Sequence, residues 1–104
     1  MVQLTVRLTA ASGRAHDVIE ALRALMRHAR RQGGCSDAHI AADAETANTF
    51  WYVEDWPDVA ALERELRTDR LSQLLALLET SVQPRLVEFM VVTGTRGLEY
   101  VTAL

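Results

Sequence analysis

The chain has 104 residues and a mass of 11.6 kDa, which is enough for one domain with one modest core. Hydrophobic residues make up 49% and charged residues 24%, an ordinary globular balance, and the net charge of -3 argues against a surface for nucleic acid or acidic membranes. Its single cysteine excludes an intrachain disulfide, and neither a membrane-spanning run nor a signal-peptide pattern is present, so we expect a cytoplasmic protein.

The first elements are a strand and a helix. Residues 2–9 alternate apolar and polar side chains, which is typical of a strand with one face in the core. Residues 15–32 carry apolar side chains at helical spacing. We expect Gly33-Gly34 to end this helix, because glycine readily adopts the backbone conformation found there.

A hairpin is predicted next. Residues 35–42 form a second, weaker strand, and the polar residues 43–48 form the turn. Residues 49–56 are aromatic and β-prone throughout and give the strongest strand pattern in the chain. Pro57 then ends the strand, and Asp58 is suited to cap the helix that follows.

The remainder predicts helical structure, one more strand and a tail. Apolar spacing continues over residues 59–80 and restarts at Thr68-Asp69. Pro84 precedes an apolar run over residues 86–93 that predicts the fourth strand. Residues 94–104 form a C-terminal extension, for which we consider an extra strand that pairs with an edge strand of a partner subunit.

The order β-α-β-β-α-β indicates an α+β fold of the ferredoxin-like type, with an antiparallel sheet and helices on one face. We expect residues 1–104 to be a single domain, with a core over residues 2–93. Helices cover one face of such a sheet, so the other face needs a cover of its own. Two sheets packed face to face would make a dimeric α+β barrel with a cavity between them.

The third strand predicts which side chains face that cavity. Glu54 shares a face with Phe50, Tyr52 and Trp56, and a face packed against leucine-rich helices should not carry an unpaired carboxylate. We therefore assign Trp51 to the face under the helices, together with Val53. The three aromatic residues and Glu54 are then expected to face outward, into a space closed by the second subunit.

Two motifs make the chain resemble the antibiotic biosynthesis monooxygenase family. One is Gly34-Cys35 at the opening of the second strand, and the other is Glu54-x-Trp56 at the end of the third, followed by a helix from Asp58. The likeness extends over about residues 2–93. It implies a homodimeric α+β barrel and a small monooxygenase that uses O₂ on a quinol or other electron-rich aromatic, without metal, flavin or haem.

The resemblance also suggests candidate site residues. Trp56 corresponds to the family tryptophan, and we expect it to form the catalytic group with Tyr52 and Glu54. Polyketide-oxidising members carry an asparagine four residues before this tryptophan, where the chain has Tyr52. Haem-degrading members need a histidine on the second helical region, and no histidine follows His39, which argues against haem degradation.

Further residues are candidates for substrate binding, and each candidate has a plainer interpretation. Phe50, Arg7 and His39 are expected to line the cavity and contact the substrate. Glu54 could equally pair with an arginine such as Arg7 or Arg85 and fix the subunit interface, and the aromatic residues could be interface packing. The first alternative function is a non-catalytic dimer of the same fold that binds a small ligand, and the second is isomerase or decomposition chemistry on a small carbonyl compound.

Overall fold

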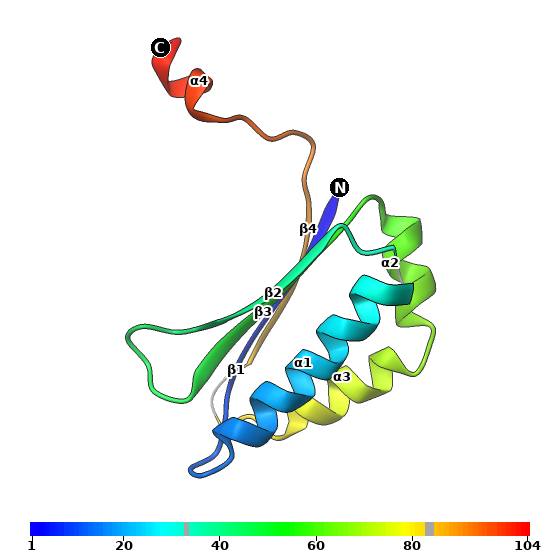
Figure 1. Ribbon diagram of the computed structural model, residues 1–104, viewed down its shortest axis with the longest axis vertical. Helices are drawn as coiled ribbons and strands as arrows, with labels where there is room; N and C mark the ends of the chain where they lie inside the picture. Colours follow the sequence, from blue (N-terminus) through cyan, green and yellow to red (C-terminus); the bar gives the residue numbers. More distant parts are fainter. Residues whose placement is uncertain (33, 83–84) are drawn as a thin grey trace.

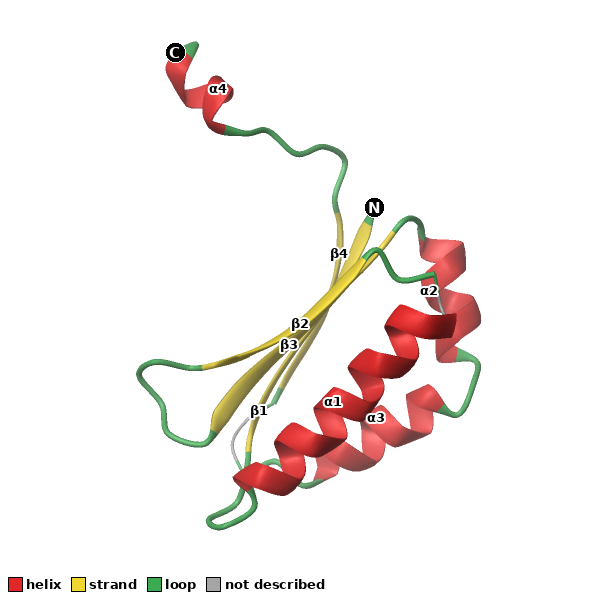
Figure 2. Cartoon of the chain, in the orientation of Figure 1, coloured by secondary structure: helices red, strands yellow, loops and turns green. Residues whose placement is uncertain are grey.

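A computed structural model describes residues 1–32, 34–82 and 85–104 (Figures 1 and 2). The elements in chain order are β1 (Val2–Thr9), α1 (Ala15–Gln32), β2 (Asp37–Ala42), β3 (Thr49–Trp56), α2 (Val59–Leu66), α3 (Arg70–Glu79), β4 (Leu86–Val91) and α4 (Leu98–Thr102). β1, α1 and β3 have the predicted bounds. Gly33 and Pro84, expected beside α1 and β4, lie outside the described residues.

The four strands form one antiparallel sheet in the order β2-β3-β1-β4. α1, α2 and α3 cover one face of this sheet, and the other face is open in the single chain (Figure 2). This arrangement confirms the predicted ferredoxin-like α+β fold. In the described part of the chain, no helix has the length and apolar character needed to cross a membrane.

The core lies between the sheet and the helices. Alternate residues of β1, among them Leu4, Val6 and Leu8, are buried against Val18 and Leu22 of α1. The predicted second helical region is two helices, because the chain breaks between Leu66 and Arg70. Asp58 caps α2 as expected, accepting a hydrogen bond of 2.8 Å from the Ala61 backbone N–H.

The predicted facing of β3 is wrong. Phe50, Tyr52, Glu54 and Trp56 lie beneath the helices, where Glu54 and Trp56 have no exposed surface. Trp51 and Val53 are the side chains on the open face. The expectation failed because it assumed an unpaired carboxylate, whereas the helix layer supplies Glu54 with a cationic partner.

The open face is mixed in character. Ladder pairing places Arg7 opposite Trp51, and the Arg7 guanidinium lies 5.7 Å from the centre of the Trp51 ring. Val53 lies between Thr5 and His39 on the neighbouring strands. Gln3 hydrogen-bonds Asp55 across β1 and β3, at 2.9 Å. This mixed surface is the one that a second copy of the chain would cover in the predicted barrel.

The C-terminal extension leaves the body of the molecule (Figure 1). Its last residues form the short helix α4, so the extra strand considered for this segment does not form in the single chain. The side chains of Leu98, Val101 and Leu104 are 76%, 61% and 90% exposed. This segment therefore presents apolar surface to solvent.

Candidate active site

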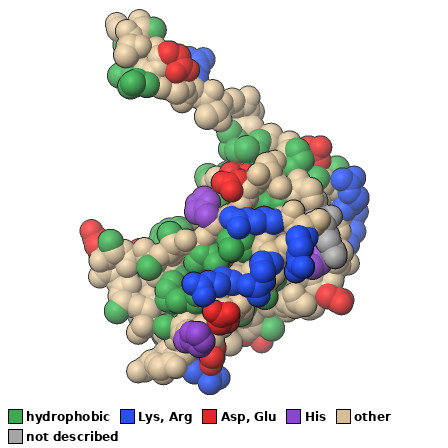
Figure 3. Space-filling view, viewed as in Figure 1, with side chains coloured by type: hydrophobic (Ala, Val, Ile, Leu, Met, Phe, Trp, Pro, Cys, Tyr) green, Lys and Arg blue, Asp and Glu red, His purple; other side chains and the backbone are tan. Residues whose placement is uncertain are grey.

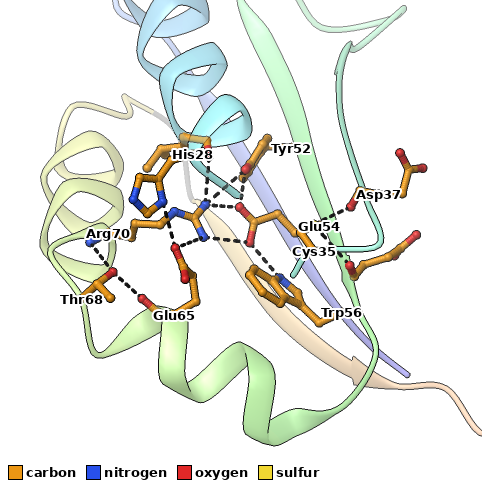
Figure 4. Close-up of polar contacts among 11 residues, drawn as sticks. His28, Cys35, Asp37, Tyr52, Glu54, Trp56, Glu65, Thr68 and Arg70 are labelled. Carbon is orange, nitrogen blue, oxygen red and sulfur yellow. Dashed lines mark hydrogen bonds and ion pairs between the residues drawn. The ribbon is translucent and has the colours of Figure 1, made fainter. Parts of the chain in front are cut away.

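The candidate site is built around the Glu54 carboxylate, which lies between the sheet and the helices (Figure 4). The Tyr52 hydroxyl donates a hydrogen bond to Glu54 Oε2, and Trp56 Nε1 donates one of 2.9 Å to Glu54 Oε1. Side chains alternate between the two faces of a strand, so these three residues project to the same side of β3. The Glu-x-Trp spacing thus places the indole N–H beside the carboxylate.

Arg70 completes the coordination of Glu54. Its guanidinium donates from Nη2 to Glu54 Oε2 and from Nη1 to Glu54 Oε1, the second contact measuring 3.5 Å. Arg70 Nη2 also donates to the Leu25 backbone carbonyl at 3.2 Å and approaches the Tyr52 hydroxyl at 3.4 Å. A buried ion pair is sustained only when hydrogen bonds satisfy both partners, and this one joins β3, α1 and α3.

Helical spacing explains why Arg70 points inward. It is the first residue of α3, and Leu74 and Leu78 follow at intervals of four residues on the same buried face. An arginine at an apolar position of a helix signals a buried counter-charge. The sequence carries this signal, because Arg70 shares a helical stripe with Leu74 and Leu78.

Glu65 and His28 extend the network towards the surface. Glu65 Oε1 lies 3.8 Å from Arg70 Nη1 and 2.8 Å from His28 Nδ1. Glu65 Oε1 and His28 Nδ1 are both buried atoms that have no hydrogen-bond partner among the described residues, so their contact is one of distance alone. The His28 side chain is 39% exposed, so it joins the buried charges to solvent.

Burial and charge alter the acid–base properties of three groups here. Desolvation, reinforced by the Glu54 carboxylate, raises the pKa of the Tyr52 hydroxyl well above its ordinary value, so Tyr52 stays protonated. Desolvation also raises the pKa of the Cys35 thiol, with Glu54 adding to the effect. Burial opposes the charge on Arg70, but the contacts with Glu54 outweigh it and raise the Arg70 pKa.

A cavity of about 10 Å³ adjoins the network, lined by Tyr52, Glu54, Arg70 and four leucines (Leu4, Leu25, Leu66 and Leu74). Such a volume holds roughly one water-sized molecule. Arg70 Nε is a buried donor that has no hydrogen-bond partner among the described residues. The site therefore combines a small, largely apolar space with a cation and a protonated phenol.

The structure brings together some of the predicted site residues and separates others. Tyr52, Glu54 and Trp56 form one network, although they lie inside the single chain and not between two sheets. The prediction that Glu54 pairs with an arginine is confirmed, but the partner is Arg70 and neither Arg7 nor Arg85. Arg7 lies on the open face, opposite the network.

The remaining predicted residues lie beside the network. Phe50 is two residues before Tyr52 on the same face of β3, and it lines a cleft between α1 and β2 together with His39. Trp56 does not line the 10 Å³ cavity and packs in a second apolar cluster with Leu62 and Ala61 of α2. Among the residues described, no three His, Cys, Asp or Glu side chains gather as metal ligands would.

Solved structures share the fold over most of their length. A Deinococcus radiodurans protein assigned to the antibiotic biosynthesis monooxygenases has a TM-score of 0.82 and 18% identity, with 94% of this chain and 98% of that chain covered. PA3566 from Pseudomonas aeruginosa has a TM-score of 0.72 and 28% identity, with 89% of this chain and 94% of that chain covered. SnoaB from Streptomyces nogalater, a cofactor-independent oxygenase solved as a mutant, has a TM-score of 0.75 and 18% identity, with 90% of this chain and 94% of that chain covered.

The sequence comparisons give one family. No curated protein matches the chain. The family model described as antibiotic biosynthesis monooxygenase matches residues 1–77, from β1 through most of α3, which includes Tyr52, Glu54, Trp56 and Arg70. The chain of 104 residues therefore belongs to the antibiotic biosynthesis monooxygenase family.

Proposed function

We propose that the protein is a monooxygenase that needs no cofactor and oxidises a quinol or another electron-rich aromatic with O₂. Family membership supports monooxygenase chemistry, and the fold is shared with SnoaB, a cofactor-independent oxygenase. The observation that carries the proposal is the small apolar cavity lined by Tyr52 and Arg70. Its volume suits a diatomic molecule such as O₂, and the Arg70 cation suits the negative charge of reduced oxygen.

The proposed reaction balances without an external reductant. A quinol and O₂ give a hydroxyquinone and water: one oxygen atom forms a bond to a ring carbon, and the other leaves as water with two hydrogens. The substrate loses four electrons and O₂ gains them. The first step is electron transfer from the deprotonated substrate to O₂, which leaves a neutral substrate radical beside superoxide, so the protein must stabilise first the substrate anion and then the reduced oxygen.

The network residues take separate roles in this proposal. Tyr52 lines the space proposed for O₂, and its raised pKa keeps on the hydroxyl the proton that it donates to Glu54. Arg70 faces the reduced oxygen. Glu54 and Trp56 are positioning residues: Glu54 holds Tyr52 and Arg70, and the Trp56 indole holds Glu54. Three side chains donate to Glu54, so both of its carboxylate oxygens are occupied within the network.

Substrate binding is proposed for Phe50 and His39, which line the cleft beside Tyr52. Arg7, the third expected contact, lies on the open face, where we propose that it meets a second copy of the chain. The proposed dimer packs two open faces together, with Trp51 and Val53 between the two sheets in place of Phe50 and Tyr52. The cytoplasmic location stays a prediction.

Oxygen uptake tests the proposed function. A panel of hydroquinones and anthrones is added to the protein with metals chelated, and O₂ consumption and products are measured. We expect uptake that saturates with substrate, and a Trp56→Phe variant should lower kcat without changing the oligomeric state. Saturable binding with no uptake across the panel would instead assign the protein as a non-catalytic ligand-binding dimer.

A further inference from the structure

A cleft between α1 and β2 has an apolar floor and a basic rim. Its volume is about 420 Å³, within the range of about 300–1,000 Å³ found for small-molecule sites. The floor is formed by Ile19, Met26, Ile40 and Phe50. Arg23 and Arg30 also line the cleft and carry its charged groups, and His39 of the edge strand adjoins it.

Helical spacing produces this combination. Ile19, Arg23, Met26 and Arg30 follow one another at intervals of four, three and four residues, so they form one stripe along α1. Apolar and cationic side chains alternate along this stripe. The stripe borders β2, the edge strand of the sheet, and the space between them is the cleft.

The charge on this face is opposite in sign to that of the whole chain. The net charge is -3, yet arginine side chains gather over apolar ones in the view of Figure 3. Arg30 Nη2 donates to the Ala38 backbone carbonyl, which holds the guanidinium at the edge of β2. Arg23 Nη1 donates to Glu20 at 2.8 Å. A guanidinium has several N–H donors, so both side chains keep donors for a ligand.

The cleft lies next to Tyr52. Ile40 is the ladder partner of Tyr52, and Phe50 precedes Tyr52 by two residues on the same face of β3. Ile19, Met26 and Ile40 pack against the apolar cluster that contains the Tyr52 ring. The cleft floor and the Tyr52 ring therefore belong to one apolar cluster.

We infer that this cleft binds an aromatic molecule that carries a carboxylate, with the ring on Phe50 and Met26 and the carboxylate on Arg23 and Arg30. The planar guanidinium matches a carboxylate through paired hydrogen bonds, and the thioether of methionine favours aromatic rings. The inference rests on the proposed function and deepens it: the electron-rich substrate is an acidic one.

Binding is tested with 2-naphthoate and its neutral analogue 2-naphthalenemethanol, by titration followed in amide NMR spectra. We expect naphthoate to perturb the amides around Ile40 and Phe50 and to bind at least ten times more tightly than the alcohol. The double variant Arg23→Gln/Arg30→Gln should lose about tenfold in naphthoate affinity and leave the alcohol unaffected. Arg67→Gln, which alters an exposed arginine outside the cleft, is the matched control.

Further variants test the charge of the cleft and its volume separately, and they control for a folding defect. Arg30 contacts Ala38, so Arg23→Gln alone, at a half-exposed position, should still weaken naphthoate binding severalfold. Ala42→Trp fills the cleft from β2 and should abolish binding with both arginines intact. Equal affinity for the two probes, unchanged affinity in these variants, or tighter binding of decanoate than of naphthoate would overturn the inference.

Failure of the cleft assignment can be distinguished from failure of the proposed function. Naphthoate carries no quinol and reports binding alone. If naphthoate binds as expected while acidic and neutral hydroquinones cause no O₂ uptake, the cleft assignment stands and the monooxygenase proposal fails. If hydroquinones are oxidised with no preference for acidic ones, and naphthoate does not bind, the proposed function stands and the cleft assignment fails.

Discussion

Arg70 and Glu54, sixteen residues apart, form a buried ion pair in which two guanidinium nitrogens meet both carboxylate oxygens. The Arg70 side chain is 6% exposed and that of Glu54 is fully buried. The pair joins the helix layer to the sheet at one point. It also positions Tyr52 and Trp56, which donate to the same carboxylate.

Replacing Arg70 with methionine should therefore destabilise the fold strongly. An uncompensated buried carboxylate costs about 3–5 kcal/mol in the free energy of unfolding. Urea denaturation measures this loss. The double variant Arg70→Met/Glu54→Gln removes the orphaned charge and should recover about 2 kcal/mol, while Arg67→Met, at an exposed position, should change stability by no more than about 0.5 kcal/mol. Equal losses in the single and double variants would contradict the pair's role.

Alkaline pH should destabilise the protein through Tyr52. The folded state raises the pKa of this hydroxyl, so the native chain holds the proton more tightly than the unfolded chain does. Its contribution to stability is complete below the ordinary tyrosine pKa of about 10 and falls as pH rises beyond it. We expect the free energy of unfolding to fall above this pH in the parent chain.

The Tyr52→Phe variant isolates that effect. Its unfolding free energy should depend less steeply on pH above about 10 than that of the parent. Some slope remains, because the Cys35 pKa is also raised and the loss of its thiol proton acts in the same direction. Tyr100→Phe, in the tail, is the control and should keep the parent slope. Identical slopes for Tyr52→Phe and the parent would show that the hydroxyl titrates normally.

The open face predicts a dimer interface that can be broken without unfolding the chain. Val53 is half-buried on that face, between Thr5 and His39. Val53→Asp should shift the mass measured by light scattering from twice 11.6 kDa to 11.6 kDa, because two copies would each bring a like charge into the contact. Leu75→Asp, at an exposed position of α3, should leave the mass unchanged. A dimer that persists in Val53→Asp would place the interface elsewhere.

The tail should contribute to association and little to the fold. Among the described residues, those beyond Val92 form no hydrogen bond with the body of the chain, and α4 exposes its apolar side chains. Deleting residues 95–104 should raise the dimer dissociation constant and leave the urea midpoint of the monomer in place. Unchanged dimerisation at low micromolar protein would defeat this prediction.

The sequence predicts most of the fold, because its strands and helices follow strong periodicities. The alternation over residues 2–9 and the aromatic run over residues 49–56 match β1 and β3 in full. The tail could not be predicted in the same way. No side chain from Leu98 onward is buried, so local preference decides between strand and helix in this segment.

Only part of the candidate site could be predicted from the alternation of side chains along β3. Alternation groups Tyr52, Glu54 and Trp56 correctly, but it does not say which face the helices cover. That choice depends on Arg70, whose contact with Glu54 is tertiary and spans sixteen residues. The arginine ahead of Leu74 and Leu78 in the same helical stripe was the information that would have reversed the assignment.

β4 has a consequence for how the chain behaves during synthesis and storage. This edge strand reads Leu-Val-Glu-Phe-Met-Val, with one charge and no proline, and most of its side chains are exposed. An uncovered edge of this kind is a template for pairing with other unfinished chains and favours aggregation. Solubility at high concentration therefore depends on how quickly β4 is covered, and Met90→Lys would supply a gatekeeper charge near the C-terminal end of this edge strand.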